Sequence, residues 1–310
     1  DLHGVTDKAE RLKRCEAYVE HLEGHVAKLQ EMHADDKHKD GAGQDAAYRN
    51  DGCVDNATEI GTDNFLFSLP AERILNGINT GEGNAAEKLE RRLSSDEDMI
   101  ELFYQHKGFD TTGTVSNAET AAYGAKNGAP AGRQNVRYMD MSGGVFMYAA
   151  GNHIGIQYNE GRNPTGIDGP VYDEATGLGT SGQYLGWGLR HEIGHEINQG
   201  CYTYAETTNN YYSQLGGAVN ETDEGLRWDY QNVYNRVTSG LKGASSGKTG
   251  IAMYWQLHLA YDDGYNYKTY DSYKQQMENL VFARIDAYAR NPQAAPKAEH
   301  NGFTFTLAGA

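Results

Sequence analysis

The stretch from Trp187 to Gln199 constrains the fold of this chain more than any other part of the sequence. It contains the pattern His-Glu-x-x-His, as His191, Glu192 and His195, in a segment that can form a helix. Two residues four apart on a helix lie about 40° apart around its axis, so both imidazoles can reach one metal ion. The glutamate beside the first histidine can then take a proton from a water molecule on that metal. The pattern therefore predicts the zinc site of a hydrolase.

The residues around the pattern favour a helix with one buried face over an exposed, charged helix. Five letters alone can match by chance in a chain that is rich in histidine and glutamate. However, Leu189, Ile193 and Ile197 repeat every four residues and predict a buried face, with the histidines on another face. Gly200 follows them, which is a typical position for a helix to stop.

A second pair of histidines, His21 and His25, has the same spacing, but Glu23 stands in the wrong position for a base. The pair lies in segment 8–33, where apolar residues alternate three and four apart and predict a long amphipathic helix. Both histidines fall off the apolar seam. We therefore expect them at the solvated surface rather than on a metal ion.

Two common solutions for the third zinc ligand fail in this sequence. Catalytic zinc usually has three protein ligands and one open position. The metzincin spacing needs a glycine at position 198 and a histidine at position 201, where this chain has Asn198 and Cys201. The thermolysin spacing, with a glutamate about twenty residues beyond the second histidine, falls on Leu215.

Glu206 is the favoured candidate that remains. A continuous helix would carry it about 16 Å along the axis from His195, whereas a ligand must come within about 2 Å of the metal. The helix must therefore end near Gly200, and the chain must turn back. Four other carboxylates compete for the role: Glu196, Glu221, Asp223 and Glu224. The first points about 100° away from His195 around the helix, and the others require a longer return loop.

These residues together resemble a known family. The run 191–199, followed by 206–213 (Glu-Thr-Thr-Asn-Asn-Tyr-Tyr-Ser), is similar to the zinc segment of the enhancin-like, mucin-degrading gluzincin metallopeptidases, peptidase family M60. Segment 147–156 resembles the strand region that precedes the zinc helix in that family, and 253–257 resembles its downstream helix. Residues 68–70 match more weakly. The resemblance extends from about residue 65 to about residue 285.

The resemblance implies a zincin-like enzyme with Zn²⁺ as its cofactor. Carried over by position, His191, His195 and Glu206 become the metal ligands, and Glu192 becomes the general base and acid. The family also implies a secreted or cell-surface zinc endopeptidase within a larger multidomain protein. Its partner would be a mucin-like, O-glycosylated protein, because several members are O-glycopeptidases that cut beside a glycosylated serine or threonine and require the sugar.

Two alternatives stay open beside this prediction. One is a general zinc peptidase that is indifferent to glycans. The other is a non-catalytic glycan-binding module with a structural metal site. Glu192 argues against the second, because a structural zinc site needs no general base and usually fills all four positions with protein ligands.

The composition excludes some classes of partner. A net charge of −16 argues against nucleic acid and against anionic membrane surfaces. No apolar run is long enough to span a membrane, so we expect no membrane insertion. The N-terminus carries no signal-peptide pattern, and a start at Asp1 is what we expect of a processed piece. Cys15, Cys53 and Cys201 cannot all pair, so they provide no disulfide framework.

We expect an α+β fold in which a zincin-like catalytic region follows a helical N-terminal region. The catalytic region would hold a small mixed sheet, the zinc helix and a mainly helical C-terminal part. The predicted boundaries are 1–110 for the N-terminal region, 131–295 for the catalytic region and 296–310 for a C-terminal tail. The run 108–132, rich in Gly, Ala, Thr and Asn, is typical of a loop or linker between the first two.

Local patterns predict the elements inside this plan. Segment 34–64 is polar; a short helix should open at Pro70, another should cover 83–93, and a third should begin at Ser95 with a weak capping box. Strands are expected within 135–141 and 145–158, followed by a polar loop over 160–182. Helices are expected near 205–215, 222–238, 250–261 and 270–289.

Two further expectations concern the substrate cleft. An edge strand beside a zinc helix can bind substrate in extended form, and Gly151–Tyr158 is the candidate. The developing oxyanion also needs a hydrogen-bond donor. Tyr211, Tyr212 and His153 are the candidates, although a lone histidine such as His153 is often structural.

Overall fold

The computed structural model describes most of the chain. The described residues are 1–32, 56–79, 82–114, 127–139, 147–151, 153–157, 187–198, 206–219, 231, 234–235, 238–239, 247–262, 272–292 and 295–306. Across this part of the chain, no helix combines the length and the apolar character needed to cross a membrane. The fold is α+β, as expected, with a small mixed sheet and a helical C-terminal part.

The chain forms two compact units, and each is assembled from segments that are far apart in sequence. The first unit contains residues 1–98, 132–196 and 217–225, and the second contains 99–131, 197–216 and 226–310. The boundaries expected at 110, 131 and 295 stay predictions.

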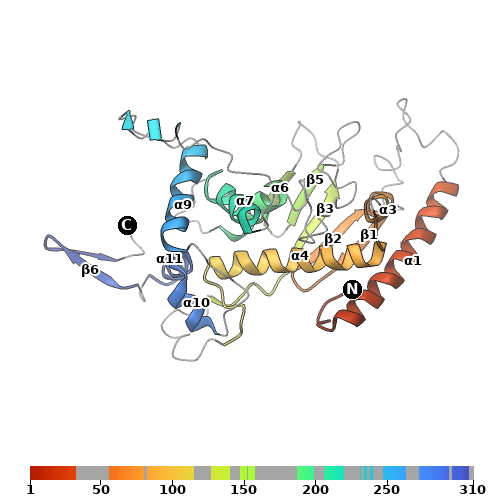
Figure 1. Cartoon of the computed structure of the whole chain (residues 1–310), viewed down its shortest axis with the longest axis horizontal. Coiled ribbons are helices and arrows are strands. Elements are labelled where there is room, and N and C mark those ends of the chain that lie inside the picture. The colour runs from red at the N-terminus through yellow and green to blue at the C-terminus, as the bar shows by residue number, and fades with distance from the viewer. Residues whose placement is uncertain are drawn as a thin grey trace. The chain divides into compact units, whose positions relative to one another are not determined.

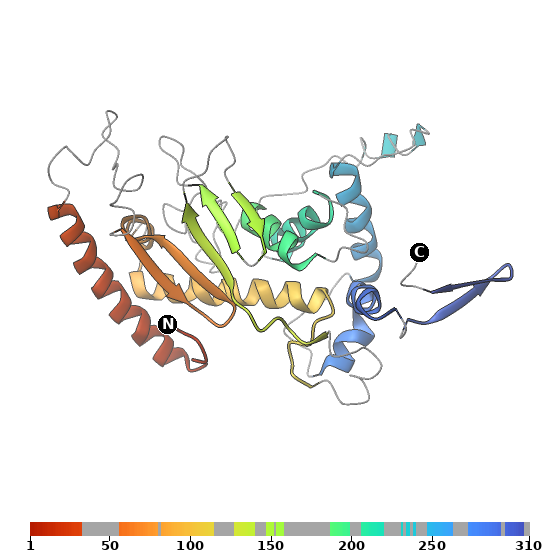
Figure 2. The same cartoon turned by 180° about the vertical axis from the view of Figure 1, so that it is seen from behind.

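A five-stranded sheet forms the centre of the first unit (Figures 1 and 2). Its strands, in chain order, are β1 (Ala57–Gly61), β2 (Phe65–Pro70), β3 (Gln134–Met139), β4 (Met147–Ala150) and β5 (His153–Gln157). Their spatial order is β1-β2-β3-β5-β4. The β2–β3 and β3–β5 pairs are parallel, whereas β1–β2 and β4–β5 are antiparallel hairpins.

Side chains alternate along each strand, and the centre of one face of this sheet is apolar. Phe67 lies opposite Val136, which lies opposite Ile154, and none of the three is exposed to solvent. Phe65 stacks on Phe67 with ring centroids 5.1 Å apart. The N-terminal half of helix α4 (Ala85–His106) crosses the sheet, in front of the strands in Figure 1 and behind them in Figure 2.

Three other helices contribute to the first unit: α1 (Lys8–Met32), α3 (Ala71–Asn79) and most of α6 (Trp187–Ile197). Helix α1 confirms the predicted amphipathic helix. It buries Cys15, Val19, Leu22, Val26 and Leu29 and contacts α3. His21 on α1 is exposed, as expected for a surface histidine, whereas His25 is half-buried.

The prediction of two helices over 83–93 and from Ser95 was wrong, because α4 is continuous. The pair Ser95–Asp98 resembles a capping box in sequence, but Ser95 Oγ donates a hydrogen bond of 2.9 Å to the Arg91 carbonyl within the helix. Asp96 likewise pairs with Arg92 one turn earlier, at 3.6 Å. Both polar side chains bond inside the helix and do not end it.

The β1–β2 hairpin was not predicted; β1 lies in the polar stretch 34–64, and β2 directly follows that stretch. The turn of the hairpin is held by Glu97 of α4, whose carboxylate accepts hydrogen bonds from the Thr62 hydroxyl and from the backbone and side-chain nitrogens of Asn64. The helix expected to open at Pro70 begins at Ala71 instead, because Pro70 is the last residue of β2. Asn56 caps that helix through the amides of Ala71 and Glu72.

The second unit is mainly helical. It contains most of α7 (Thr208–Val219), together with α9 (Gly247–Tyr261), α10 (Tyr273–Asn279), α11 (Val281–Arg290), and the hairpin of β6 (Lys297–His300) and β7 (Phe303–Thr306). The single helix expected over 270–289 is divided at Leu280, whose backbone is extended. The hairpin lies in the segment expected to be a tail. Segment 160–182 and most of 222–238 fall outside the described residues.

The C-terminal part of α4, from Met99 onward, belongs to the second unit, and Gly108 follows its last turn. Its φ of +67° is the left-handed conformation typical of a helix C-terminus. Its carbonyl accepts hydrogen bonds from the Tyr273 hydroxyl at 2.8 Å and from Arg290 at 2.7 Å. A Cβ atom at this position would lie 2.2 Å from the Ala283 carbonyl oxygen, so only glycine fits. Next to it, the buried Lys107 pairs with Asp286 of α11 at 3.1 Å.

Candidate functional site

Helix α6 carries the His-Glu-x-x-His pattern on a helix with a buried apolar face, as predicted. Leu189 and Ile193 are fully buried, and Ile197 is 6% exposed. His191 and His195 are half-buried, and Glu192 is buried at 7% exposed. The histidines therefore stay accessible to a ligand while the apolar face fixes the helix.

The side chains of the pattern converge as metal coordination requires. One ligand atom each from His191, Glu192 and His195 lies within 4.8 Å of the others. The two imidazole rings have centroids 4.8 Å apart and are inclined by 83°. Ligand atoms about 2.0–2.1 Å from a tetrahedral zinc ion lie about 3.3 Å apart, so small side-chain rotations suffice. Two imidazoles are donors that suit Zn²⁺, and a carboxylate beside them could take a proton from a water molecule on the metal.

Glu206 lies in the turn just before α7, and its side chain is exposed. Its φ is +60°, which is uncommon for a residue other than glycine. The side chain of Asn210 holds this turn by donating a hydrogen bond to the Glu206 carbonyl at 2.5 Å. Unusual backbone conformations are concentrated at functional sites. Glu206 belongs to the second unit, and its role as third ligand stays a prediction.

The competing carboxylates divide into two groups. Glu196 is half-buried on α6, and burial raises the pKa of its carboxyl group. Glu221, Asp223 and Glu224 fall outside the described residues.

The edge strand differs from the one predicted. Gly151, with a φ of +72°, turns the chain so that β4 folds back along β5. Among the described strands, β5 therefore lies inside the sheet and β4 lies at its edge. The prediction that Gly151–Tyr158 is the edge strand was wrong, and Met147–Ala150 takes that place.

His153 forms a pair with Tyr148 across this hairpin. The Tyr148 hydroxyl and His153 Nε2 are 2.7 Å apart, and the two rings meet edge to face. Partial burial, and then the positive charge of Arg137, lowers the pKa of His153. The alternation along β5 places His153 on the face opposite Ile154 and Ile156. Its role as an oxyanion donor stays a prediction. The five-residue separation across a turn was the only sequence signal for this pair.

No protein-family model matches the sequence, and no curated protein matches it. Solved structures do match. The catalytic module of the metalloprotease ZmpA from Clostridium perfringens is 18% identical with a TM-score of 0.51, over 93% of this chain and 48% of that one. The M60 catalytic domain of ZmpB from the same organism, with its CBM51-1 and CBM51-2 domains, is 20% identical with a TM-score of 0.50, over 92% and 26%. This chain has the M60 fold.

A third solved structure also matches. IMPa from Pseudomonas aeruginosa, solved in complex with an O-glycopeptide, is 16% identical with a TM-score of 0.50, over 77% of this chain and 27% of that one. The chain spans less than half the length of each of these three structures. The similarity to these three structures establishes the fold of this chain, which is the fold expected from the sequence.

Within this M60 fold, the second unit holds the other two candidate oxyanion donors in its interior. Tyr211 and Tyr212 are each 2% exposed. The Tyr211 hydroxyl and His106 Nε2 are 2.8 Å apart. Burial, and then the negative charges of Asp262 and Asp286, raises the pKa of Tyr211 well above its usual value. These contacts favour a structural role for Tyr211.

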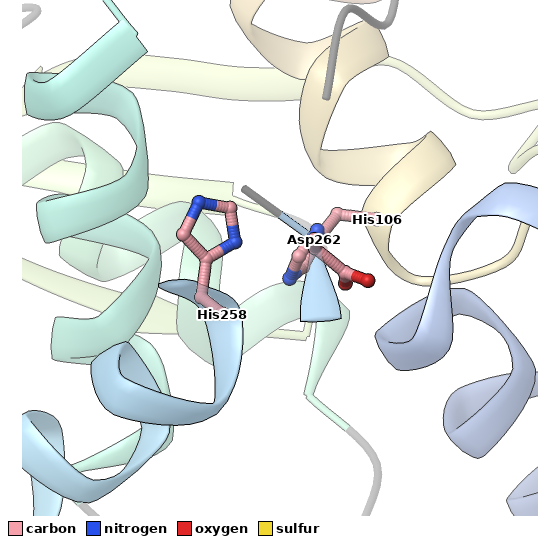
Figure 3. Close-up of side chains that lie close together, drawn as sticks. All are labelled: His106, His258 and Asp262. Atoms are coloured by element: carbon pink, nitrogen blue, oxygen red, sulfur yellow. The ribbon is translucent and has the colours of Figure 1, made fainter. Parts of the chain in front are cut away.

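A further cluster of ligand-type side chains was not anticipated from the sequence. His106, His258 and Asp262 of the second unit lie together in its interior (Figure 3). The spacing of four between His258 and Asp262 was the only signal available. Nothing in the sequence around His106 points to the other two residues.

Proposed function

We propose that this chain is a zinc-dependent endopeptidase with its catalytic site on helix α6. The observation that carries the proposal is the convergence of His191, Glu192 and His195, with one ligand atom of each within 4.8 Å of the others. Two histidines would hold the metal, and Glu206 would complete the set of protein ligands. The similarity of the fold to the catalytic module of the metalloprotease ZmpA supports the proposed peptidase activity.

Each residue of the site has a distinct role in this proposal. A bound zinc ion would polarise the scissile carbonyl group and lower the pKa of the attacking water. Glu192, beside the first histidine, would act as the general base for that water and as the general acid toward the leaving amine. Glu192 is buried, and its carboxylate lies near the two histidines that would hold the metal.

The proposed substrates are mucin-type O-glycosylated proteins, cut next to a glycosylated serine or threonine. Support comes from the family resemblance of the zinc segment and from IMPa, a protein of similar fold that was solved with an O-glycopeptide. We further propose that the chain acts outside the cell or at its surface, as part of a larger protein. The ZmpB structure, in which carbohydrate-binding modules accompany the M60 domain, supports the multidomain setting.

The test is mass spectrometry of the products from a mucin-type O-glycopeptide and from the same peptide without sugar. Each peptide is incubated with the protein in the presence and absence of a zinc chelator. We expect cleavage of the glycosylated peptide alone, abolished by the chelator, with the new terminus beside the sugar.

The other outcomes decide between the alternatives. Chelator-sensitive cleavage of both peptides would favour a general zinc peptidase. If a panel of O-glycans yields no cleavage but does yield binding, the protein is a glycan-binding module and the proposal fails.

A further inference from the structure

We propose that His106, His258 and Asp262 form a second metal site, for a divalent transition metal ion such as Zn²⁺. One ligand atom from each of the three residues lies within 4.8 Å of the others, and all three side chains are buried. Two imidazoles and one carboxylate are a donor set used for zinc and for other divalent transition metals. This site is additional to the one on α6, and all of its residues belong to the second unit.

The fold brings the three residues together from the ends of two helices. His258 and Asp262 are four apart at the end of α9, and the Asp262 amide donates a 2.7 Å hydrogen bond to the His258 carbonyl. The helical turn therefore continues to Asp262 and places both side chains on one face. His106 is the last residue of α4, and its ring centroid lies 5.9 Å from that of His258. Figure 3 shows the three side chains gathered where the two helices end.

The surrounding hydrogen bonds resemble those that orient metal ligands. Histidine ligands usually engage a partner through the ring nitrogen that does not bind the metal. The Tyr211 hydroxyl occupies this position, 2.8 Å from His106 Nε2, which assigns Nδ1 of that ring to the metal. The Asp262 carboxylate is oriented at the N-terminus of α11, where it accepts the amides of Val281 at 2.8 Å and Phe282 at 3.2 Å.

Aromatic rings enclose the cluster. Phe282 stacks on His106 with ring centroids 5.0 Å apart, and Trp255 stacks on His258 at 4.7 Å. Burial lowers the pKa of His106 well below its usual value, so its imidazole is neutral, which is the form that binds metals. Burial raises the pKa of Asp262, and a cation bound beside it would offset that penalty on the charged carboxylate.

A metal ion at this buried position would stabilise the second unit by linking its helices. A metal ion here would join the C-terminal end of α4 to the end of α9. Through the Asp262 carboxylate it would also fix the start of α11. Three protein ligands leave a fourth position for a water molecule. The alternative is that the two histidines and the surrounding rings form a cluster that is stabilised by packing and binds no metal. A measurement of metal binding distinguishes this alternative from the proposal.

The experiment measures zinc binding in a chain whose α6 site has been removed. The double variant His191→Ala/His195→Ala is stripped with a chelator, reloaded with Zn²⁺, and analysed by inductively coupled plasma mass spectrometry and thermal unfolding. We expect one zinc ion per chain and a higher Tm with zinc than without. Co²⁺ in place of zinc should give the visible absorption bands of a site with nitrogen and oxygen ligands.

A third substitution in the same background locates the ion. His258→Gln should weaken zinc binding at least tenfold; if that variant does not fold, Asp262→Asn serves instead, because it keeps an oxygen acceptor for α11. The matched control is His21→Ala/His25→Ala, which removes the second pair of histidines four residues apart, on α1, and should leave the zinc content unchanged. A folded double variant that binds no zinc would overturn the proposal. Loss of zinc in His21→Ala/His25→Ala, with zinc retained in His258→Gln, would also overturn it. Because the α6 ligands are absent, neither result depends on the proposed peptidase activity.

Discussion

Glu192 and Glu196 are glutamates on the same helix in different surroundings. Glu192 is buried beside two histidines, whereas Glu196 is half-buried and follows the second of them. We predict that Glu192→Gln keeps its zinc but loses turnover by roughly 10²–10⁴-fold, because the amide cannot accept the proton of the attacking water. Zinc content and kcat on the O-glycopeptide provide the measurement. Glu196→Gln is the control and should retain most of its activity. Substantial turnover in Glu192→Gln would remove Glu192 from the role of base.

Glu206 is predicted to hold the metal rather than to move protons. We expect Glu206→Ala to weaken zinc binding at least tenfold and to lower activity, with part of the activity restored by excess zinc. A competition assay with a chromophoric chelator measures the affinity. Glu221→Ala is the matched control, because Glu221 is a rival ligand by sequence. If Glu206→Ala keeps its zinc affinity, or if Glu221→Ala loses more of it, Glu206 is not the third ligand.

At the scale of residues, the sequence predicts sites that lie within one helix and misses those that assemble across the fold. His191 and His195 are four apart, so helix geometry alone brings them together. His106 meets His258 only after the ends of α4 and α9 have packed. The Tyr148–His153 pair similarly needs the register of the β4–β5 hairpin. No local spacing contains that information.

The β1–β2 hairpin depends on a side chain of another element. Glu97 of α4 accepts hydrogen bonds from Thr62 and Asn64, the residues of the turn. We predict that Glu97→Ala lowers the free energy of unfolding by roughly 2 kcal/mol, because the buried Thr62 and the half-buried Asn64 lose a charged acceptor. Urea denaturation gives the size of the change, and hydrogen exchange shows whether the amides of β1 and β2 lose protection. The exposed Glu87 lies on the same helix, and Glu87→Gln should change stability little. If the β1 and β2 amides are equally protected from hydrogen exchange in Glu97→Ala and in the natural chain, the prediction is contradicted.

At the scale of elements, apolar periodicity was a better guide than capping signals. The three-and-four spacing along α1 predicted both its extent and its buried residues. Ser95 and Asp98 suggested a helix start, although the helix passes through them, because short polar side chains can bond to the preceding turn as easily as to the following one. The strands β1 and β2 were missed because polar residues surround them and because Glu97, far along the chain, holds their turn.

The stability of the whole molecule should depend on pH through Asp96. Burial raises the pKa of this carboxyl group to about 7, against the opposing effect of Arg92. An acid whose pKa is raised on folding stabilises the fold below its unfolded value and loses that contribution as pH rises through its folded value. The loss should therefore occur between about pH 4 and pH 7 and amount to a few kcal/mol, by roughly 1.4 kcal/mol for each unit of pKa.

Urea midpoints from pH 4.5 to 8 measure this effect. Asp96→Asn should show a smaller decline in stability with rising pH than the natural chain, whatever its stability at any one pH. Asp98→Asn, which alters a half-exposed carboxylate two residues along α4, should keep the natural slope. Parallel pH profiles for the natural chain and Asp96→Asn would show that Asp96 titrates in the same range whether folded or unfolded.

Because residues 99–131 of the second unit separate β2 from β3 in the sequence, the two neighbouring strands of the sheet are synthesised at different times. A ribosome completes the β1–β2 hairpin long before β3, the parallel neighbour of β2, which begins at Gln134. At about 5–20 residues per second, the interval between Pro70 and Gln134 lasts on the order of 3–13 s. Throughout that interval β2, which contains Phe65 and Phe67, would have one edge without a partner strand. The nascent chain would therefore expose an aggregation-prone strand for several seconds. The yield of folded protein in a cell should depend on whether a chaperone covers that strand until β3 emerges.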